Sequence, residues 1–565
     1  MNTTLFLFTI GPVKSFIEHS RKARDLYAGS YLLSYLMRAA VEELHRHKPK
    51  LEIIFPLANQ SNVPNRLIAK VNGYSQREKE QLGQELSQFV QKRFIELCEQ
   101  IFDKSKVIPN QIATRQIERF LELYWVFEPE PDYSLAYNKI NANLNNIKRL
   151  RSFEQTFESS GRKCNIYPEY NAIFVKQKDG KLPSFVDEQN VIDVTQLETC
   201  RYSMKPGEGL SAIAFIKRML HLLEADQLLP EYSLNISSVA YMLLKNSWRK
   251  EKYKELELLK DEASEALFDL QNGQKLSIDE YSSDNIEIAK KMYQELNSDA
   301  FRVSPYYALL KFDGDGMGQL YRDYPTRQTQ EQLSQNTSHF SNRVRAIISE
   351  QGGICIYAGG EDFLGFLPVS KLFITLYQLR QEFIAQVKSP VEHGKSLTFS
   401  AGIVIAHLMQ PLGAMLARTS EMERQAKELY EEKNAFAIGL VKRSGDQLLV
   451  KSSFGKNGEI LLLIDKIATA LSQKEYSKSF IYNLSKTLEK LGGINSSDQQ
   501  SLVRVLIEQA LQKSTSFISN QEFASQSNML YELFLHFDSD MARFKSFLQF
   551  LEFVSRGACS DALRH

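Results

Sequence analysis

The sequence predicts an α+β protein with two ferredoxin-like units, a helical accessory region and a C-terminal helical bundle. The chain has 565 residues, about three times the usual domain length, which favours three or four domains. Strand and helix patterns alternate at the start of the chain, and they resume after Pro305 in an order that contains β-α-β-β-α-β. From Glu459 onward the apolar spacing is helical, with almost no strand signal.

The first ferredoxin-like unit opens on an apolar strand that ends at Gly11-Pro12. The expected elements are a strand over 3–10, helices over 13–24 and 27–47, strands over 53–56 and 67–71, and helices over 75–103 and 112–124. The start of the chain has no basic flank and no small-residue cleavage site, so it is typical of a strand and not of a signal peptide. Since glycine ends the first strand where the second unit has an acid, we expect this unit to lack catalytic carboxylates.

The second unit has the clearer pattern. Its expected elements are a strand over 306–312, an acidic glycine-rich loop, a helix over 331–350, strands over 354–358 and 363–369, a helix over 371–387, a strand over 397–407, a helix over 412–432 and a strand over 435–442. Before it, between about 150 and 300, the pattern weakens to short elements and charged helix-like runs over 243–270 and 284–298. The predicted domains are therefore 1–145, 146–300, 301–450 and 451–565.

Composition excludes several classes of protein. With 69 Lys and Arg against 68 Asp and Glu, the net charge is +1, so no global basic field attracts nucleic acid, and RNA contacts must be local or supplied by partners. No run approaches the roughly 18 apolar residues of a membrane span, and we expect a cytoplasmic protein without membrane contact. The five cysteines never form a Cys-x-x-Cys pair, which argues against disulfides and against a thiolate zinc site.

The candidate chemistry lies on two neighbouring strands of the second unit. One strand delivers Asp313 at its end, and a turn at Gly359-Gly360 presents Glu361 and Asp362. Carboxylates that converge repel one another, and a divalent cation such as Mg²⁺ or Mn²⁺, or a pair of them, relieves that repulsion. The glycines permit a positive-φ turn and the close approach of a nucleotide. An ordinary hairpin with solvated acids is the alternative. Asp315 is expected to be an exposed loop acid, with a metal ligand as the alternative.

Other readings of the acidic loop fail. An EF-hand needs an oxygen ligand at the fifth position and Glu at the twelfth, but the sequence has Met317 and Tyr324 there. A dinucleotide fingerprint fails at Gln319, and no Gly-x-x-x-x-Gly-Lys-Ser/Thr loop occurs in the chain.

Several motifs together resemble one family. The sequence around Asp313, the run Tyr357-Ala358-Gly359-Gly360-Glu361-Asp362-Phe363, the run Leu397–Ile403 and Ala426-Lys427-Glu428 resemble the Palm domain of GGDEF-type and class III nucleotide cyclases. Within that superfamily the chain resembles the large polymerase-like subunit of Cmr-type (type III-B) CRISPR effector complexes. The N-terminal part of this resemblance rests on Ile10–Ile17, Ala23–Ser34, Ile54-Phe55-Pro56, Val63-Pro64-Asn65-Arg66, Gly161–Cys164 and Leu210–Arg218.

The resemblance implies roles for individual residues. The metal ligands fall on Asp313, Glu361 and Asp362, which are also the catalytic residues, and Lys427 neutralises phosphate. Gly359, Gly360 and Ser400 are expected beside the nucleotide. A turn at Gly29-Ser30 is expected to contact a second nucleotide across the two Palm units, with a helix break as the alternative.

Three departures from the family pattern qualify these roles. Glu361 stands where the family usually has Asp, which keeps the carboxylate but lengthens it by one methylene. There is no His-Asp dipeptide, so no HD nuclease domain and no DNA cleavage are expected. Tyr167, Ser211 and Ala214 stand at the spacings where relatives place zinc-binding cysteines, so no zinc is expected.

Three hypotheses follow for function. The resemblance implies an RNA-activated synthase that joins ATP into cyclic oligoadenylates, within a complex of other Cmr-type subunits, crRNA and target RNA. A catalytically silent scaffold subunit of the same complex is the first alternative. A free-standing dinucleotide cyclase that uses GTP is the second, which the long flanking regions and the lack of a sensor module disfavour.

Overall fold

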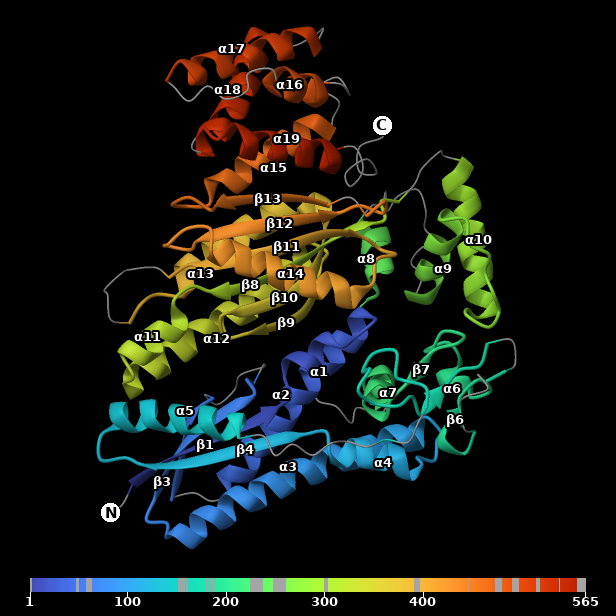
Figure 1. The fold of residues 1–565 in the computed structure, drawn as a ribbon, viewed down its shortest axis with the longest axis vertical. Coiled ribbons are helices and arrows are strands. Elements are labelled where there is room, and N and C mark those ends of the chain that lie inside the picture. Colours follow the sequence, from blue (N-terminus) through green and yellow to red (C-terminus); the bar gives the residue numbers. More distant parts are fainter. Residues whose placement is uncertain are drawn as a thin grey trace.

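A computed structural model gives the fold of the chain (Figure 1). The structure describes residues 3–46, 50–56, 63–150, 158, 161–178, 181–182, 186, 188–223, 237–246, 261–298, 303–390, 397–445, 447–472, 480–489, 497–514, 519–537 and 539–555. Among the helices in these ranges, none is both long enough and apolar enough to cross a membrane.

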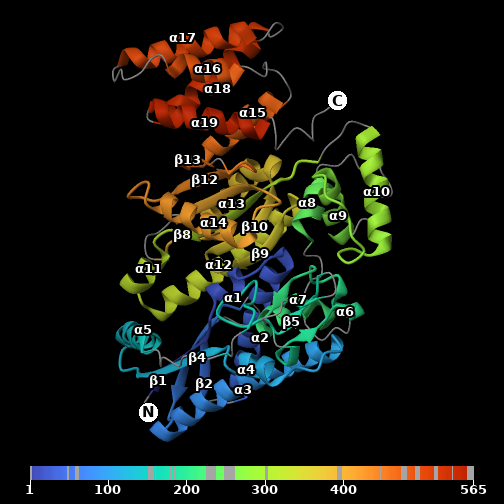
Figure 2. The same cartoon turned by 45° about the vertical axis from the view of Figure 1, so that its right-hand side comes forward.

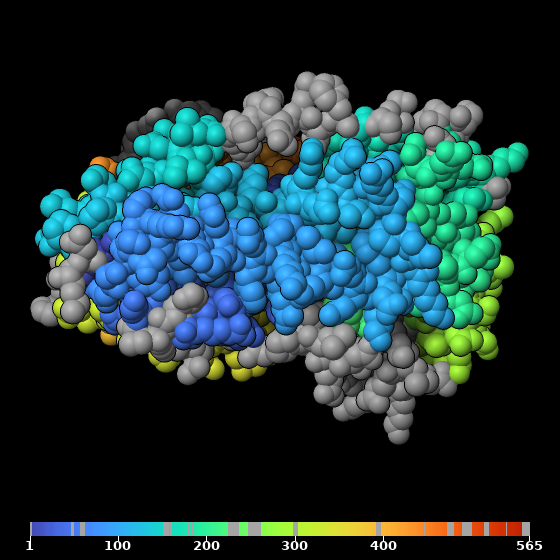
Figure 3. Space-filling model, turned by 90° about the horizontal axis from the view of Figure 1, so that it is seen from below, coloured from blue at the N-terminus to red at the C-terminus, as the bar shows by residue number. Residues whose placement is uncertain are grey.

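The N-terminal unit contains a four-stranded antiparallel sheet. Its elements are β1 (Thr3–Gly11), α1 (Lys14–Glu18), α2 (Ala23–His45), β2 (Leu51–Phe55), β3 (Arg66–Asn72), α3 (Gln76–Lys104), α4 (Gln111–Glu118), β4 (Glu122–Pro129) and α5 (Tyr133–Arg149). The strand order β2-β3-β1-β4 is that of a ferredoxin-like fold, with the fully buried run of Leu5 to Phe8 at its centre. Figure 3, which views the molecule from below, shows α3 and α4 spread over this end of it.

Two predictions for this unit need correction. The stretch 13–24 is not one helix, because the chain breaks between Glu18 and Ala23 into α1 and α2. The helix predicted over 112–124 ends at Glu118, and the residues after it form β4. The run Leu123 to Phe127 is rich in aromatic and β-branched side chains, which suit a pleated sheet better than a helix. This strand completes the ferredoxin-like sheet.

The central region combines short strands with helices. Its elements are β5 (Phe174–Val175), β6 (Ile192–Asp193), α6 (Glu198–Arg201), β7 (Gly209–Leu210), α7 (Ala212–Met219), α8 (Val239–Asn246), α9 (Asp261–Gln271) and α10 (Ser283–Ser298). Of the helix-like run predicted over 243–270, residues 247–260 lie outside the described part of the chain. Buried Arg218 on α7 joins the central region to the N-terminal unit through a 2.7 Å ion pair with Asp25 on α2. It also forms an ion pair of 3.3 Å with Glu208 of the central region.

His221, which follows α7, predicts an acid-sensitive contribution to stability. Burial first, and the positive charge of Arg24 second, lower the pKa of His221 to about 4 from 6.5. The unfolded chain therefore binds more protons below pH 6.5, so this contribution is present above pH 6.5 and is lost as the pH falls toward 4. When the pH falls from 7 to 4.5, we expect protonation of His221 in the unfolded chain to lower the free energy of unfolding by about 2 kcal/mol.

Chemical denaturation of the full chain at the two pH values measures this contribution. His221→Gln should lose less stability on acidification than the unsubstituted chain, whereas His339→Gln, at an exposed position of the second unit, should lose as much. Equal acid losses in all three proteins would contradict the assignment.

The second unit has a six-stranded sheet. Its elements are β8 (Tyr306–Gly314), α11 (Met317–Asp323), α12 (Arg327–Glu350), β9 (Ile354–Gly359), β10 (Asp362–Pro368), α13 (Leu372–Gln386), β11 (Phe399–His407), α14 (Leu412–Lys427), β12 (Ala435–Val441) and β13 (Gln447–Ser453). The order β13-β12-β11-β8-β10-β9 again contains the ferredoxin-like core, so the predicted fold class is confirmed. The prediction missed β13, and it also missed α11, which replaces most of the expected acidic loop.

The C-terminal residues form helices that pack on the second unit. They are α15 (Glu459–Ser472), α16 (Phe480–Glu489), α17 (Ser497–Ser514), α18 (Asn520–His536) and α19 (Met541–Phe553), as the helical spacing predicted. Figures 1 and 2 show them stacked on the side of the sheet where β13 lies, with the N-terminal unit on the opposite side. The two ferredoxin-like units meet through an Arg327–Glu52 ion pair of 2.7 Å and a 2.7 Å hydrogen bond from Tyr133 to Gln330.

Candidate active site

Two carboxylates meet at the centre of the second sheet. β10 pairs antiparallel with β8, and Phe363 lies opposite Phe312, so the next residues outward are Asp362 and Asp313. Their carboxyl groups share a hydrogen bond. The predicted juxtaposition of the strand end and the turn is therefore present in the structure.

The turn itself is shorter than the sequence indicated. Gly359 still pairs with Asp362, so the two central residues are Gly360 and Glu361. Only Gly360 takes a positive φ, of 64°, and a Cβ there would meet no atom within 4 Å. Gly359 is instead covered by Tyr357, whose hydroxyl donates to the Gly359 carbonyl at 3.2 Å. Open space therefore lies at Gly360, whereas the Gly359 backbone is partly screened.

Asp313 and Asp362 share one proton unequally. Burial raises the pKa of Asp362, and the nearby charge of Asp313 raises it further, so it lies far above its ordinary value. Burial also acts to raise the pKa of Asp313, but hydrogen bonds from Asp362 and Lys427 outweigh it, and the pKa of Asp313 is lowered. In the absence of a cation, Asp313 is the ionised member of the pair and Asp362 the protonated one.

Lys427 places a positive charge on this pair. Its ammonium group contacts the Asp313 carboxylate and lies 2.9 Å from Glu423, one helical turn earlier on α14. The other Glu423 oxygen lies 3.1 Å from Lys311 on β8. Sequence reasoning missed Glu423 and Lys311. The i, i+4 spacing of Glu423 and Lys427 could have revealed the first of them.

Gly402 lets α14 lie close enough for Lys427 to reach Asp313. A Cβ on Gly402 would collide with the backbone nitrogen of Glu423 and the carbonyl oxygen of Thr419. Because both are backbone atoms of α14, the collision could be relieved only by moving the helix. A glycine on β11 therefore sets the distance between the helix and the strand beneath it.

Asp315 and Ser400 lie beneath the site and not at its surface. The expectation that Asp315 is an exposed loop acid is wrong, since it is 8% exposed and accepts hydrogen bonds from Thr398 at 2.8 Å and from the Asn434 backbone at 3.1 Å. Ser400 is fully buried opposite Asp313 in the sheet, where its hydroxyl faces Asp315 and the Ala435 backbone. In this conformation Ser400 supports the strand end and has no surface to offer a nucleotide.

Gly29 and Ser30 do not form a turn or a helix break. Both lie inside α2, Ser30 is only 6% exposed, and a Cβ on Gly29 would stand 2.9 Å from the carbonyl oxygen of Phe16. The glycine therefore permits α1 to pack against α2. Their contact with a second nucleotide stays a prediction.

Glu361 stands slightly apart from the other two acids. Its Cβ packs against Gly314, and burial first, with Asp313 second, raises the pKa of its carboxyl group. No three His, Cys, Asp or Glu side chains in the described ranges are grouped as ligands of one metal ion. Asp313 and Asp362 thus form a close pair with the charge of Glu361 nearby, and metal binding by the three acids stays a prediction.

The residues at the expected zinc spacings have structural contacts of their own. The Cys164 sulfur accepts hydrogen bonds from the backbone of Tyr167 at 3.4 Å and of Ser211 at 3.1 Å. The Ser211 side chain caps α7, and the Tyr167 hydroxyl donates to the Phe16 carbonyl. That the chain holds no zinc stays a prediction.

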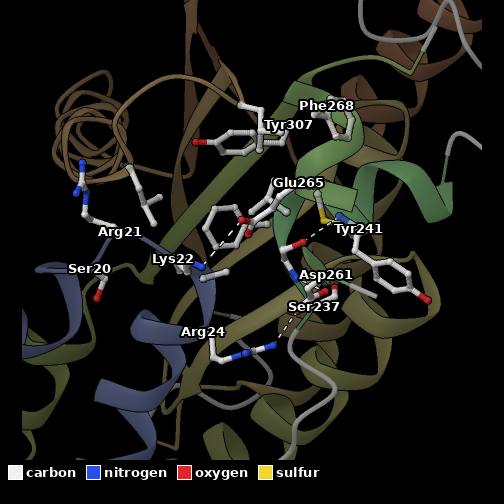
Figure 4. A pocket seen from close by; sticks show the side chains of 18 of the residues that line it. Ser20, Arg21, Lys22, Arg24, Ser237, Tyr241, Asp261, Glu265, Phe268 and Tyr307 are labelled. Atoms are coloured by element: carbon white, nitrogen blue, oxygen red, sulfur yellow. Dashed lines mark hydrogen bonds and ion pairs between the residues drawn. The ribbon is translucent and has the colours of Figure 1, made fainter. Parts of the chain in front are cut away.

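A cavity of about 1550 Å³ lies away from these acids, at the opposite end of the second sheet (Figure 4). Tyr307 at the start of β8 lines it, together with Lys22 and Arg24 of the N-terminal unit and Asp261 and Glu265 of α9. An Arg24–Asp261 ion pair of 2.9 Å and a Lys22–Glu265 contact of 4.0 Å cross between these elements. Lys22 and Arg24 at this cavity therefore each have a carboxylate partner.

Comparisons with known proteins give matches over both ferredoxin-like units. Residues 5–163 match the N-terminal domain of the CRISPR-associated protein Cmr2, and residues 306–437 match the second palm domain of Cas10/Cmr2. The CRISPR system Cmr subunit Cmr2 of Pyrococcus furiosus is 27% identical over 553 residues, which cover 78% of this chain and 62% of that protein. The chain thus spans less than two thirds of the length of this curated relative.

Two solved structures share the fold. A chain of the type III-B Cmr-beta complex in the apo state matches with a TM-score of 0.66 and 14% identity, covering 95% of this chain and 82% of that one. A chain of the same complex bound to cognate target RNA matches with a TM-score of 0.64 and 13% identity, covering 95% and 83%. With both domain models, the Cmr2 relative and the shared fold in agreement, the chain belongs to the Cas10/Cmr2 family.

Proposed function

We propose that this chain is the nucleotide-cyclising subunit of a type III-B CRISPR effector complex and joins ATP into cyclic oligoadenylates when target RNA is bound. The single observation that carries the proposal is the Asp313–Asp362 pair at the centre of a palm sheet, with Lys427 in contact with it. The match to the second palm domain of Cas10/Cmr2 supports a nucleotidyl-transfer reaction, and the Cmr2 relative is named as a Cmr subunit.

The donor set fits a hard divalent cation. Asp313 and Asp362 provide carboxylate oxygens on adjacent strands, and Mg²⁺ is commonly held by one or two carboxylates together with substrate phosphates. Burial and the charge of Asp313 raise the pKa of Asp362, and a bound cation would favour its ionised form. Asp313 and Asp362 would hold Mg²⁺ or Mn²⁺, with Glu361 beside them, and the bound cation would neutralise charge that develops on the phosphates. The number of ions, predicted as two, remains part of the proposal.

The chemistry asked of the site is phosphoryl transfer. The 3′-hydroxyl oxygen of one nucleotide bonds to the α-phosphorus of another, the hydroxyl proton is lost, and the bond to the β-phosphate breaks to release pyrophosphate. Lys427 is placed to face the triphosphate, since its ammonium group lies at the carboxylate pair. The open space at Gly360 allows a nucleotide to approach the turn, and the last of several such steps closes the ring.

The neighbouring N-terminal unit offers a place for the second nucleotide. Tyr321 on α11 lies in the electrostatic field of both Glu361 and Arg66, and Arg66 belongs to β3 of the N-terminal sheet. The two units therefore approach each other beside the candidate site. Because the net charge is only +1, we propose that other Cmr-type subunits and the crRNA present the target RNA to this chain.

Incubation with labelled ATP and Mg²⁺ or Mn²⁺ tests the function. The assembled complex with complementary target RNA should form cyclic oligoadenylates, which mass spectrometry identifies, and the isolated chain should turn ATP over poorly. A parallel reaction of the isolated chain with GTP tests the alternative hypothesis of a free-standing dinucleotide cyclase. Assembly with full RNA binding but without any product would establish the silent scaffold instead.

A further inference from the structure

Four side chains of alternating charge extend from the candidate site along the face of the sheet that α14 covers. In order they are Asp313, Lys427, Glu423 and Lys311. Their side chains are 30%, 24%, 13% and 27% exposed, so all four are largely withdrawn from water. Ion pairs at this depth are less screened than pairs on the surface, which makes their arrangement energetically relevant.

The Lys427–Asp313 contact conflicts with the binding of a divalent cation. The ammonium group of Lys427 contacts the Asp313 carboxylate, so it occupies the position from which a cation would bind that carboxylate. Two cations cannot both neutralise one carboxylate at contact distance without strong mutual repulsion. If the cation binds Asp313, the ammonium group must move, and a half-buried ammonium group needs another acceptor.

Glu423 lies in the position that such an acceptor needs. Its Oε1 atom already lies 2.9 Å from the Lys427 ammonium group, so a small rotation transfers the full charge-assisted hydrogen bond to Glu423. Its Oε2 atom is held separately, 3.1 Å from Lys311, and Lys311 also donates to the Ser420 hydroxyl at 3.2 Å. Glu423 therefore keeps its position when Lys427 moves, because a second lysine anchors it.

We propose that Glu423 is a positioning residue that takes up Lys427 when a divalent cation binds Asp313. Lys427 thus acts as an internal counterion of Asp313 until a cation binds, and Glu423 keeps it beside the site, facing the phosphates, after its displacement. This inference rests on the metal-binding part of the proposed function. It adds that Lys427 and the metal compete for Asp313, and that Glu423 favours the metal by accepting Lys427.

Binding of Mn²⁺ alone to the full chain, followed by electron paramagnetic resonance of the free ion, tests the inference without any catalytic readout. Lys427→Met should tighten Mn²⁺ binding, because the competing ammonium group is gone. Glu423→Gln should weaken it by about three- to thirtyfold, since Lys427 then stays on Asp313. In the Lys427→Met background, Glu423→Gln should have no further effect on Mn²⁺ affinity, because the ammonium group of Lys427 that Glu423 would accept is absent.

Two controls separate the possible failures. Glu428→Gln removes an acid beside Lys427 that pairs with Arg424 at an exposed position, and it should leave the Mn²⁺ affinity unchanged. If Glu423→Gln weakens binding equally with and without Lys427, its charge acts only through the general field, and the positioning role is overturned. If Asp313→Asn leaves Mn²⁺ binding intact, the metal site of the proposed function fails, and the inference fails with it. Thermal unfolding of each variant confirms that it is folded.

Discussion

Asparagine in place of Asp313 is expected to lower cyclic oligoadenylate formation by roughly a thousandfold or more. The substitution removes the ionised carboxylate of the Asp313–Asp362 pair, and with it the acidic partner that Lys427 has on β8. Stabilisation of transition-state charge by a bound metal is worth several kcal/mol, and each 1.4 kcal/mol is about tenfold in rate. Asp362→Asn should have a loss of similar size, because it removes the second ligand of the same cation.

The rate of product formation by the assembled complex, with target RNA and saturating ATP, measures this loss. Asp323→Asn is the matched control, since Asp323 lies on α11 at an exposed position and its carboxylate accepts hydrogen bonds from Gln319. It should leave the rate unchanged. Product formation at the normal rate by Asp313→Asn would show that these acids do not carry the chemistry.

Alanine in place of Gly402 is expected to destabilise the chain and to disable the site at once. The added Cβ collides with backbone atoms of Glu423 and Thr419, so α14 must shift away from β11. Overpacking of this kind costs about 1–3 kcal/mol, and the shift also carries Lys427 away from Asp313. We expect a lower melting temperature, and a fall in product formation that persists at temperatures where the protein remains folded.

Gly413 on α14 provides the opposite case. A Cβ there meets no atom within 4 Å, so Gly413→Ala adds only helix propensity and should raise stability by up to about 1 kcal/mol. Calorimetric melting of the two variants side by side measures the difference. A Gly402→Ala protein that melts and reacts like the Gly413→Ala protein would show that α14 is free to adjust at no cost.

The elements that carry the site could be predicted because their patterns are local. Alternating and apolar runs marked β8 and β10, and the acids at their ends were placed on adjacent strands by the ferredoxin-like order alone. The family was identified from motifs, and the domain matches confirm it. In contrast, β4 was mistaken for part of a helix, because its aromatic residues also fit a helical spacing and only pairing with β1 decides the matter.

The errors at the site have a common physical cause, which is that burial depends on the tertiary structure. Asp315 has the same glycine-rich surroundings as an exposed loop acid, and only the approach of Thr398 and Asn434 buries it. Gly29-Ser30 has the composition of a turn, yet the close packing of α1 against α2 uses the glycine inside a helix. The sequence signal of Glu423 is its i, i+4 spacing to Lys427, whereas its contact with Lys311 on β8 depends on the tertiary structure.

The parallel pairing of β11 and β12 also decides how fast the site can respond. α14 is the crossover between these adjacent strands, so the strands fix both of its ends and the close contact at Gly402 holds its middle. A helix restrained in this way shifts only at a cost in stability, as the Gly402→Ala variant would show. Rearrangement of Lys427 is therefore confined to rotamer changes, which take picoseconds to nanoseconds in accessible side chains and not the micro- to milliseconds of moving domains. Amide hydrogens of α14 should accordingly exchange equally slowly before and after a cation binds.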